Sequence, residues 1–239
     1  MSELGRVLGG GAALPRHRYR DVWNAVSITE SDAIMSVLGA RDEEGLRVAA
    51  QETLDRLKRT VGIRADDVVL DIGCGVGRMG GVLAPLCRRW IGVDVADNMV
   101  RHAARRLSHA SNVEVRRISG YDLSGIASRS VDLAYCTVVF MHLDEWDRFK
   151  YVSEGYRVLR PGGRMFVDNV NLVSDEGWAF FVEHVESYSP SSRPPHISKT
   201  STPDEMRTYF QRAGFTDIVQ ESQGLWITTY GRRPEEEPS

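Results

Sequence analysis

Lysine is almost missing from this sequence. Lys58, Lys150 and Lys199 are the only lysines among 30 basic residues in a chain of 239, so arginine carries most of the positive charge. We attribute this bias to a GC-rich genome. With 33 acidic residues the formal net charge is −3, which gives no long-range attraction to nucleic-acid phosphates. We therefore expect no nucleic-acid partner.

Cysteines and long apolar runs are also scarce. The three cysteines, Cys74, Cys87 and Cys136, are odd in number and contain no C-x-x-C pair. Both facts argue against a disulfide framework and against a zinc ribbon. No run approaches the ~20 apolar residues of a membrane helix, and the N-terminus lacks a charged region followed by an apolar one. We expect reduced thiols and a cytoplasmic protein without membrane contact.

The N-terminal quarter predicts helices. Residues 1–15 are rich in glycine and alanine without apolar periodicity, so we expect them to be mobile. Apolar residues within 19–61 recur at helical spacing, which predicts two or more helices. Arginines alternate with Tyr19 and Trp23, a pattern also met in nucleic-acid binders. With a net negative charge, we prefer a flexible N-terminus and helical lid over 1–62, with both aromatic residues contacting the substrate.

From residue 67 short β-branched runs alternate with helical stretches. This alternation predicts an α/β fold with a doubly wound, mostly parallel, seven-stranded sheet. The expected strands are 68–70, 91–93, 113–115, 131–135, 164–167, 216–222 and 225–230, and the expected helices are about 76–87, 97–107, 144–159, 175–187 and 203–213. Thr202 and Pro203 mark the start of the last helix as N-cap and first-turn proline. The domain spans 63–232, and the acidic tail, 233–239, is predicted to be disordered.

The most informative stretch is a buried strand that enters a glycine loop and then a helix, from Val68 to Arg78. Glycines let the backbone approach a ligand closely and leave the first helical N–H groups facing it. The loop also fits the dinucleotide pattern G-x-G-x-x-G. However, Asp71 before the first glycine would repel a pyrophosphate, and no lysine lies four residues after a tyrosine, as a Tyr-x-x-x-Lys dehydrogenase pair requires. A cationic ligand is therefore favoured over a nicotinamide dinucleotide.

Further segments complete a recognisable pattern. They are Asp94 after the second strand, Gly120-Tyr121-Asp122-Leu123 after the third and Leu159-Arg160-Pro161-Gly162-Gly163 before the fifth. With them, residues 67–230 resemble the class I S-adenosylmethionine-dependent methyltransferases. A narrower resemblance is to the sugar O-methyltransferases of mycobacterial methylmannose polysaccharide synthesis. The resemblance implies a Rossmann-like methyltransferase fold and S-adenosylmethionine as cofactor.

The resemblance also implies a set of cofactor contacts. These are Asp71, Gly73, Cys74, Gly75 and Gly77 to the methionine moiety, Asp94 to both ribose hydroxyls, Val95 and Met99 to the adenine face, Tyr121, Asp122 and Leu123 to its edge, and Thr137 and Val138 near the sulfonium. Simpler interpretations stay open for three residues. Met99 fits a plain core position, Asp122 a turn, and Arg78 a contact with solvent or the lid.

His142 is the predicted general base. It follows the fourth strand, at the carboxyl edge where doubly wound sheets bind ligands, and histidine accepts protons near neutral pH. Alternatively it caps the next helix or fills a strand–helix interface. His196 is a second candidate contact, because the proline-rich segment 189–196 is typical of an active-site loop or a lid hinge.

The fifth strand ends in Asp168 and Asn169, which resemble the metal-ligand pair of catechol-type O-methyltransferases. The third ligand there is an aspartate after the fourth strand, where this chain has Tyr135-Cys136-Thr137. We therefore predict no metal. We expect both residues to contact a polyhydroxylated acceptor, unless they are turn residues at the strand end.

Together these residues predict O-methylation of a small-molecule acceptor, a sugar or polyhydroxylated metabolite, with His142 as base. Two rivals stay open. An N-methyltransferase of a small amine would depend little on His142, and a non-catalytic, cofactor-binding regulatory domain would show no turnover. Self-association as a homodimer is left open.

Overall fold

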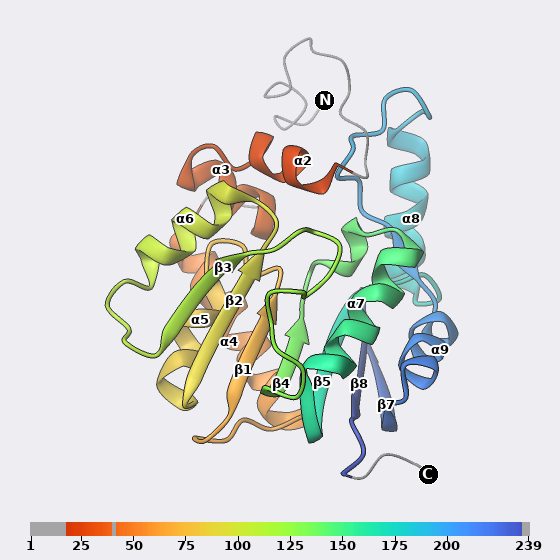
Figure 1. The fold of residues 1–239 in the computed structure, drawn as a ribbon. Helices are drawn as coiled ribbons and strands as arrows, with labels where there is room; N and C mark the ends of the chain where they lie inside the picture. Colours follow the sequence, from red (N-terminus) through yellow and green to blue (C-terminus); the bar gives the residue numbers. More distant parts are fainter. Residues whose placement is uncertain (1–17, 40–41, 236–239) are drawn as a thin grey trace.

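The chain is built around one twisted sheet. A computed structural model describes residues 18–39 and 42–235, and its strands follow the order β3-β2-β1-β4-β5-β8-β7, with β6 beside β5 (Figure 1). The strands are β1 Val68–Ile72, β2 Arg89–Asp94, β3 Val113–Arg117, β4 Val131–Cys136, β5 Leu159–Asn171, β6 Thr200–Ser201, β7 Thr216–Gln223 and β8 Trp226–Arg232. Strands β1 to β6 pair in parallel, whereas β8 is antiparallel to β5 and β7. The predicted α/β class is confirmed, and the short β6 is an addition.

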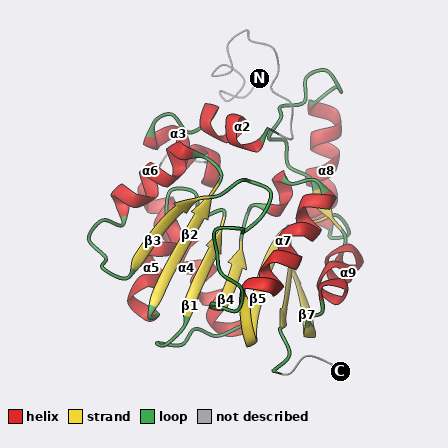
Figure 2. Cartoon of the chain, in the orientation of Figure 1, coloured by secondary structure: helices red, strands yellow, loops and turns green. Residues whose placement is uncertain are grey.

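Helices cover both faces of the sheet (Figure 2). They are α2 Tyr19–Ala25, α3 Glu30–Leu38, α4 Glu43–Thr60, α5 Arg78–Leu83, α6 Asp97–Arg106, α7 Glu145–Val158, α8 Asp175–Ser187 and α9 Pro203–Ala213, with the 3-10 turns η1 Ala84–Leu86 and η2 Phe140–His142. One core joins α7 and α9 to the sheet and a second joins α4, α5 and α6 to its other face. None of the helices in the described ranges is long and apolar enough to cross a membrane.

The central strand β1 shows how the sequence divides between these cores. All five of its residues are buried, as expected of a parallel strand covered on both faces. Leu70 and Ile72 belong to the α7/α9 core and Val69 to the opposite one, which follows from the two-residue period of a strand. Asp71 is the polar exception, and it lies where the strand runs out into the glycine loop.

Two predicted elements have different bounds for local reasons. The helix expected over 76–87 starts only after Gly77, whose φ of 78° is left-handed, and its α-helical part stops before Pro85 in η1, because proline lacks the N–H that continues a helix. The strand expected over 164–167 already begins at Leu159, and a register shift between Val131 and Leu133 of β4 absorbs the extra residues.

The described residues begin at Arg18 and end at Glu235. The predicted mobile segment 1–15 and residues 236–239 of the predicted tail lie outside the described residues. Arg233, also assigned to the tail, is ordered and buried: its backbone N–H donates to Gly163 O over 2.8 Å and its guanidinium to Leu159 O over 3.0 Å. The tail prediction is therefore wrong at its first residue, because an arginine satisfies carbonyls at the start of β5.

Helices α2 and α3 lie across the carboxyl ends of the central strands (Figure 1). At one side the Tyr19 hydroxyl donates to Asp147 Oδ2 over 2.6 Å. At the other, Asn24 accepts from the backbone N–H of Asn98 over 3.1 Å and Arg20 pairs with Asp97. This is the position that a lid requires, and movement of the two helices stays a prediction. The three cysteines are free and buried.

Candidate active site

A pocket lies at the carboxyl ends of β1, β2 and β4, next to α2 and α3. Among the residues predicted from sequence, those that line it are Tyr19, Trp23, Asp71, Gly73, Cys74, Gly75, Asp94, Val95, Met99, Thr137, Val138 and His142. The structure thus brings residues from four separated segments to one place. Gly77, Tyr121, Asp122, Leu123, Asp168, Asn169 and His196 are not part of the lining.

The glycine loop turns back over the end of β2. Gly73 has a φ of 79° and its N–H donates to Val93 O over 2.8 Å. A side chain there would overlap Val139, and one at Gly75 would lie 3.0 Å from Val37 of α3. Glycine is required at both positions because the backbone conformation is left-handed and the side chains of Val139 and Val37 lie close by.

Asp94 ends β2, and its carboxylate holds the glycine loop through a hydrogen bond. Its Oδ2 accepts the Gly75 N–H and its Oδ1 accepts the Ala96 N–H, each over 2.9 Å. Burial raises the pKa of this carboxyl, and the backbone N–H donors pull it back down. Each carboxylate oxygen has two lone pairs, so Asp94 retains acceptor capacity for two hydroxyls from a ligand in the pocket.

Asp71 is a buried carboxyl on the pocket wall, with only 3% of its surface exposed. Burial raises its pKa from 3.8 to about 7, against the hydrogen bond from the Tyr135 hydroxyl and the charge of Arg78. The Tyr135 hydroxyl itself accepts from Trp90 Nε1 over 3.1 Å. A buried acid of this kind gains most from a cationic ligand, whose charge would compensate for the lost water.

The predicted adenine contacts at Tyr121, Asp122 and Leu123 need correction. Leu123 is fully buried in the α7/α9 core, so its side chain does not reach the pocket. Asp122 accepts from Ser119 Oγ over 2.8 Å, which is the turn role left open above. Tyr121 is exposed beside Lys150.

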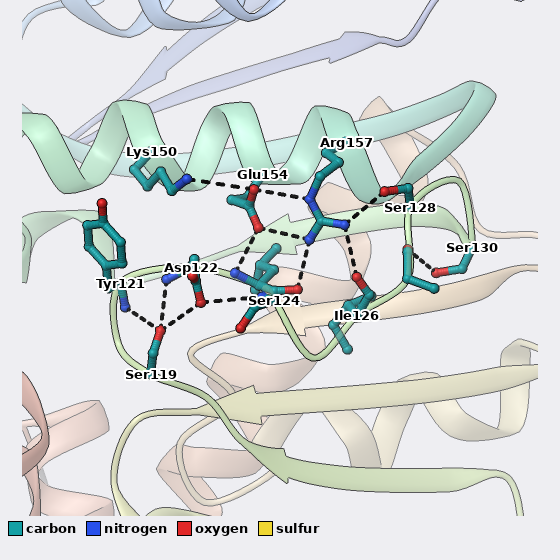
Figure 3. Close-up of polar contacts among 12 residues, drawn as sticks. Ser119, Tyr121, Asp122, Ser124, Ile126, Ser128, Ser130, Lys150, Glu154 and Arg157 are labelled. Carbon is teal, nitrogen blue, oxygen red and sulfur yellow. Dashed lines mark hydrogen bonds and ion pairs between the residues drawn. The ribbon is translucent and has the colours of Figure 1, made fainter.

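An ion pair on α7 explains this arrangement (Figure 3). Glu154 Oε2 accepts the Leu123 N–H over 3.0 Å, and Arg157 Nη2 donates to Leu123 O over 2.8 Å. Arg157 also donates to Ile126 O over 3.0 Å. The loop after β3 is thereby fastened to α7, and Ile118 and Gly120 form the pocket wall on this side.

Gly77 serves the fold rather than the ligand. It is the N-cap of α5 with a φ of 78°. A side chain at this position would come within 3.0–3.2 Å of Leu107 and Ala103 around α6. Met99 has both roles considered above, because it is buried in a small core with Ala33 and Ile34 and also lines the pocket.

His142 ends η2, and its ring is held on two sides. Its Nδ1 lies 3.0 Å from the carbonyl oxygen of His196, a contact that requires a proton on Nδ1. In the neutral ring Nε2 is then the acceptor nitrogen. The ring also meets Trp23 edge-on, with centroids 4.8 Å apart. His196 therefore contributes its backbone carbonyl to the site. We predicted a contact of His196 with the substrate, but His196 is not part of the pocket lining.

Asp168 and Asn169 do not face the pocket, so the prediction that they contact the acceptor is wrong. Both are fully buried. Asp168 accepts from Val138 N over 2.7 Å and from Arg56 over 3.1 Å, and Asn169 donates to Ser201 over 2.6 Å. Within the described residues no three His, Cys, Asp or Glu side chains group as metal ligands, and metal independence stays a prediction.

Several lining residues were not predicted. They are Ser36, Val37, Ile72, Arg78, Met79, Ile118, Gly120, Val139, Leu143 and Tyr151. Arg78 donates to Ala49 O over 2.9 Å and to Thr53 Oγ1 over 3.1 Å, both in α4. For Arg78 we had considered a contact with solvent or with the helical lid over 1–62, and the structure shows the contact with that helical segment. Gly120 carries a local signal, a glycine just after a strand. The α3 residues carry none, because their approach is purely tertiary.

Comparison with known proteins adds a family to this geometry. Residues 70–167 match a family model described as a methyltransferase domain. A Mycolicibacterium smegmatis protein named as a probable S-adenosylmethionine-dependent methyltransferase is 36% identical over 44% of this chain and 39% of its own length. A Mycobacterium tuberculosis protein of the same description is 28% identical over 86% of this chain and 70% of its own.

A solved structure agrees in fold. The phosphoethanolamine N-methyltransferase 2 of Haemonchus contortus, in complex with S-adenosylhomocysteine, superposes with a TM-score of 0.69 at 18% identity, over 90% of this chain and 60% of that one.

The pocket fits S-adenosylmethionine, the cofactor that these comparisons indicate. Asp71 offers a buried carboxylate to a cationic amino group, Asp94 offers acceptor capacity to a ribose diol, and apolar Val95 and Met99 line the wall beyond Asp94. The two glycines keep the loop free of side chains where the ligand must pass close to the backbone. From this site and the matched domain, the chain belongs to the class I S-adenosylmethionine-dependent methyltransferases.

Proposed function

We propose that the protein methylates a hydroxyl group of a small molecule, with His142 as the general base. The observation that carries the proposal is the Nδ1 contact to His196 O, 3.0 Å long, on a ring that lines the cofactor pocket. The bound cofactor supplies an electrophilic methyl group on its sulfonium, so the chain has only to align the acceptor and remove its proton.

The residues around the base support this division of labour. The His196 carbonyl holds the proton on Nδ1, which directs the accepting Nε2 as the site for a hydroxyl proton. When the ring takes up that proton, the carbonyl continues to accept from Nδ1, so the imidazolium keeps its partner. Trp23 fixes the ring plane from the side of α2.

The acceptor's chemistry follows from the rest of the wall. Near His142 the lining is mostly aromatic or apolar, with Tyr19, Trp23, Val139 and Leu143, and the Tyr19 hydroxyl is engaged by Asp147. The carboxylate and amide expected for a polyhydroxylated ligand are buried elsewhere. We therefore favour a hydroxyl on an aromatic or apolar body. One feature still favours a sugar acceptor: the Trp23 ring is suited to stacking on the apolar face of a sugar ring.

Replacement of His142 by alanine tests the proposal. We expect kcat to fall by roughly 10²–10⁴-fold, the usual contribution of a general base. Binding of S-adenosylhomocysteine should stay nearly unchanged because Asp71 and Asp94 are untouched. Methyl transfer would be measured by mass spectrometry on a panel of phenols, alcohols and sugars, with exposed His109→Ala as the matched control.

Adding small amines to this panel separates the rival functions. Amine acceptors that turn over equally well in wild type and His142→Ala would establish an N-methyltransferase and refute the hydroxyl assignment. Tight binding of S-adenosylhomocysteine without turnover of any acceptor class would instead favour a non-catalytic cofactor-binding domain.

A further inference from the structure

We propose that Asp168 is a positioning residue that holds the strained backbone of Val138 and thereby sets the pocket wall that carries His142. For its catalytic consequence the inference rests on the function proposed above. Asp168 itself touches neither the pocket nor the reacting atoms.

The strain lies in the peptide after β4. Val138 has a φ of 61°, in the left-handed region. This conformation is uncommon for any residue with a side chain and is a genuine outlier for a β-branched one. Residues held in such conformations persist only where the surrounding structure over-determines them, and they cluster at functional sites. Val138 lines the cofactor pocket.

A buried carboxylate supplies that restraint. Asp168 Oδ1 accepts the Val138 N–H over 2.7 Å, and Asp168 is fully buried near the end of β5. Its Oδ2 is 3.1 Å from Arg56 Nη2, which reaches across from α4 with about a fifth of its side chain exposed. Hydrogen bonds from a backbone N–H to a charged acceptor are stronger than neutral ones. Burial raises the pKa of Asp168, and the charge of Arg56 and the Val138 N–H act against that rise.

Val138 connects this pair to both halves of the site. Its neighbour Val139 packs directly over Gly73 of the glycine loop. The Val139 carbonyl oxygen accepts the backbone N–H of His142 over 2.8 Å in η2. A change of backbone conformation at Val138 would therefore displace the cover of the glycine loop and the anchor of the base together.

A second buried pair offers a matched control on the same sheet. Asp67 Oδ2 and Arg164 Nη2 are 2.5 Å apart, and both side chains are 3% exposed. Arg164 lies in β5, four residues before Asp168, and neither Asp67 nor Arg164 lines the pocket. Asp67→Asn thus weakens a comparable ion pair and should lower stability without changing the site.

The experiment compares Asp168→Asn, Asp168→Ala, Val138→Gly and the double variant Asp168→Ala/Val138→Gly with Asp67→Asn. We expect Asp168→Ala to lower kcat by on the order of 10- to 100-fold, as small misplacements of catalytic groups do, and Asp168→Asn to lose less, because its amide oxygen still accepts the Val138 N–H. Glycine tolerates a positive φ, so Val138→Gly should restore part of the activity lost in Asp168→Ala.

Two readouts work without an acceptor. The affinity for S-adenosylhomocysteine, measured by calorimetry, should fall in Asp168→Ala and recover in the double variant. The NMR signals of the His142 ring, assigned by their loss in His142→Ala, should shift in Asp168→Ala and stay in place in Asp67→Asn. These shifts test the positioning even if His142 proves not to be the base.

Three results would overturn the inference. They are unchanged affinity and ring signals in Asp168→Ala, the same losses in Asp67→Asn, or a double variant no better than Asp168→Ala. If Asp168→Ala does not fold, the inference is tested instead with Asp168→Asn, alone and combined with Val138→Gly. A folded Asp168→Asn with a partial loss of affinity and shifted ring signals, both relieved by adding Val138→Gly, supports the restraint. Loss in Asp168→Asn that Val138→Gly does not relieve refutes it.

Discussion

Replacing Asp71 by asparagine should make the cofactor-free protein more stable and bind its ligand less well. The carboxyl is buried, and its pKa is raised from 3.8 to about 7. Between pH 4 and pH 7 the native state therefore keeps a proton that the unfolded chain has released. The free energy of unfolding falls as pH rises through this window, and above pH 7 this group causes no further fall.

The shift sets the magnitude of the effect. A change from 3.8 to about 7 corresponds to on the order of 4 kcal/mol of native-state free energy at pH 8. Asparagine has nearly the same shape and no charge. The stability of Asp71→Asn relative to wild type should therefore rise from near zero at pH 4 to this full difference above pH 7.

Ligand binding should respond in the opposite sense. The wild-type carboxylate can pair with the amino group of S-adenosylhomocysteine, and losing a charge-assisted bond of this type costs about 1.5–3 kcal/mol, roughly 10- to 150-fold in Kd. Urea unfolding at pH 4.5 and pH 8 measures the stability effect, and calorimetry at pH 8 measures affinity. Asp55→Asn, which removes an exposed carboxylate on α4, is the control for net charge.

The reasoning would fail on either of two results. One is an Asp71→Asn variant whose stability relative to wild type is the same at both pH values. The other is unchanged affinity for S-adenosylhomocysteine at pH 8, since that would mean that the carboxylate does not face the ligand's cation.

Three further predictions concern the same pocket. Asp94→Ala should lose about 1.5–3 kcal/mol of cofactor affinity in calorimetry, since two charge-assisted hydrogen bonds disappear, and unchanged affinity would mean that the ribose site is misassigned. Catalysis should survive a chelator, and loss of all activity that magnesium restores would contradict this. Tyr19→Phe removes the 2.6 Å bond to Asp147 and should speed release of S-adenosylhomocysteine in stopped-flow fluorescence, whereas an unaltered release rate would show that α2 does not retain the ligand.

The features predicted correctly from sequence are those with local causes. The helix expected over 203–213 has these bounds in the structure, because Thr202 caps it and Gly214 ends it in a left-handed conformation. The glycine loop after β1 was equally local. Strand β1 reads as buried because its apolar run faces both layers of helices.

The residues that were misplaced depend on partners far along the chain. Asp168 was assigned to the acceptor, yet its carboxylate bonds Arg56, 112 residues away. The residues 163–171 of β5 are all buried, so no alternation of polar and apolar positions reveals which way Asp168 points. Leu123 was assigned to the adenine edge from the family resemblance, whereas the ion pair on α7 draws the loop after β3 into the core.

Hydrogen bonds connect the fluorescent side chain of Trp90 to the buried carboxyl of Asp71. The fully buried indole donates to Tyr135, whose hydroxyl bonds the carboxyl that changes charge with pH and with the arrival of a cation. Ligand occupancy should therefore alter the electric field at Trp90 and shift its emission, while the exposed Trp146 and Trp178 keep a red-shifted background. In a Trp23→Phe variant, which lacks the tryptophan of the pocket wall, the Trp90 emission would report ligand binding. The measurement needs no added label and no knowledge of the acceptor.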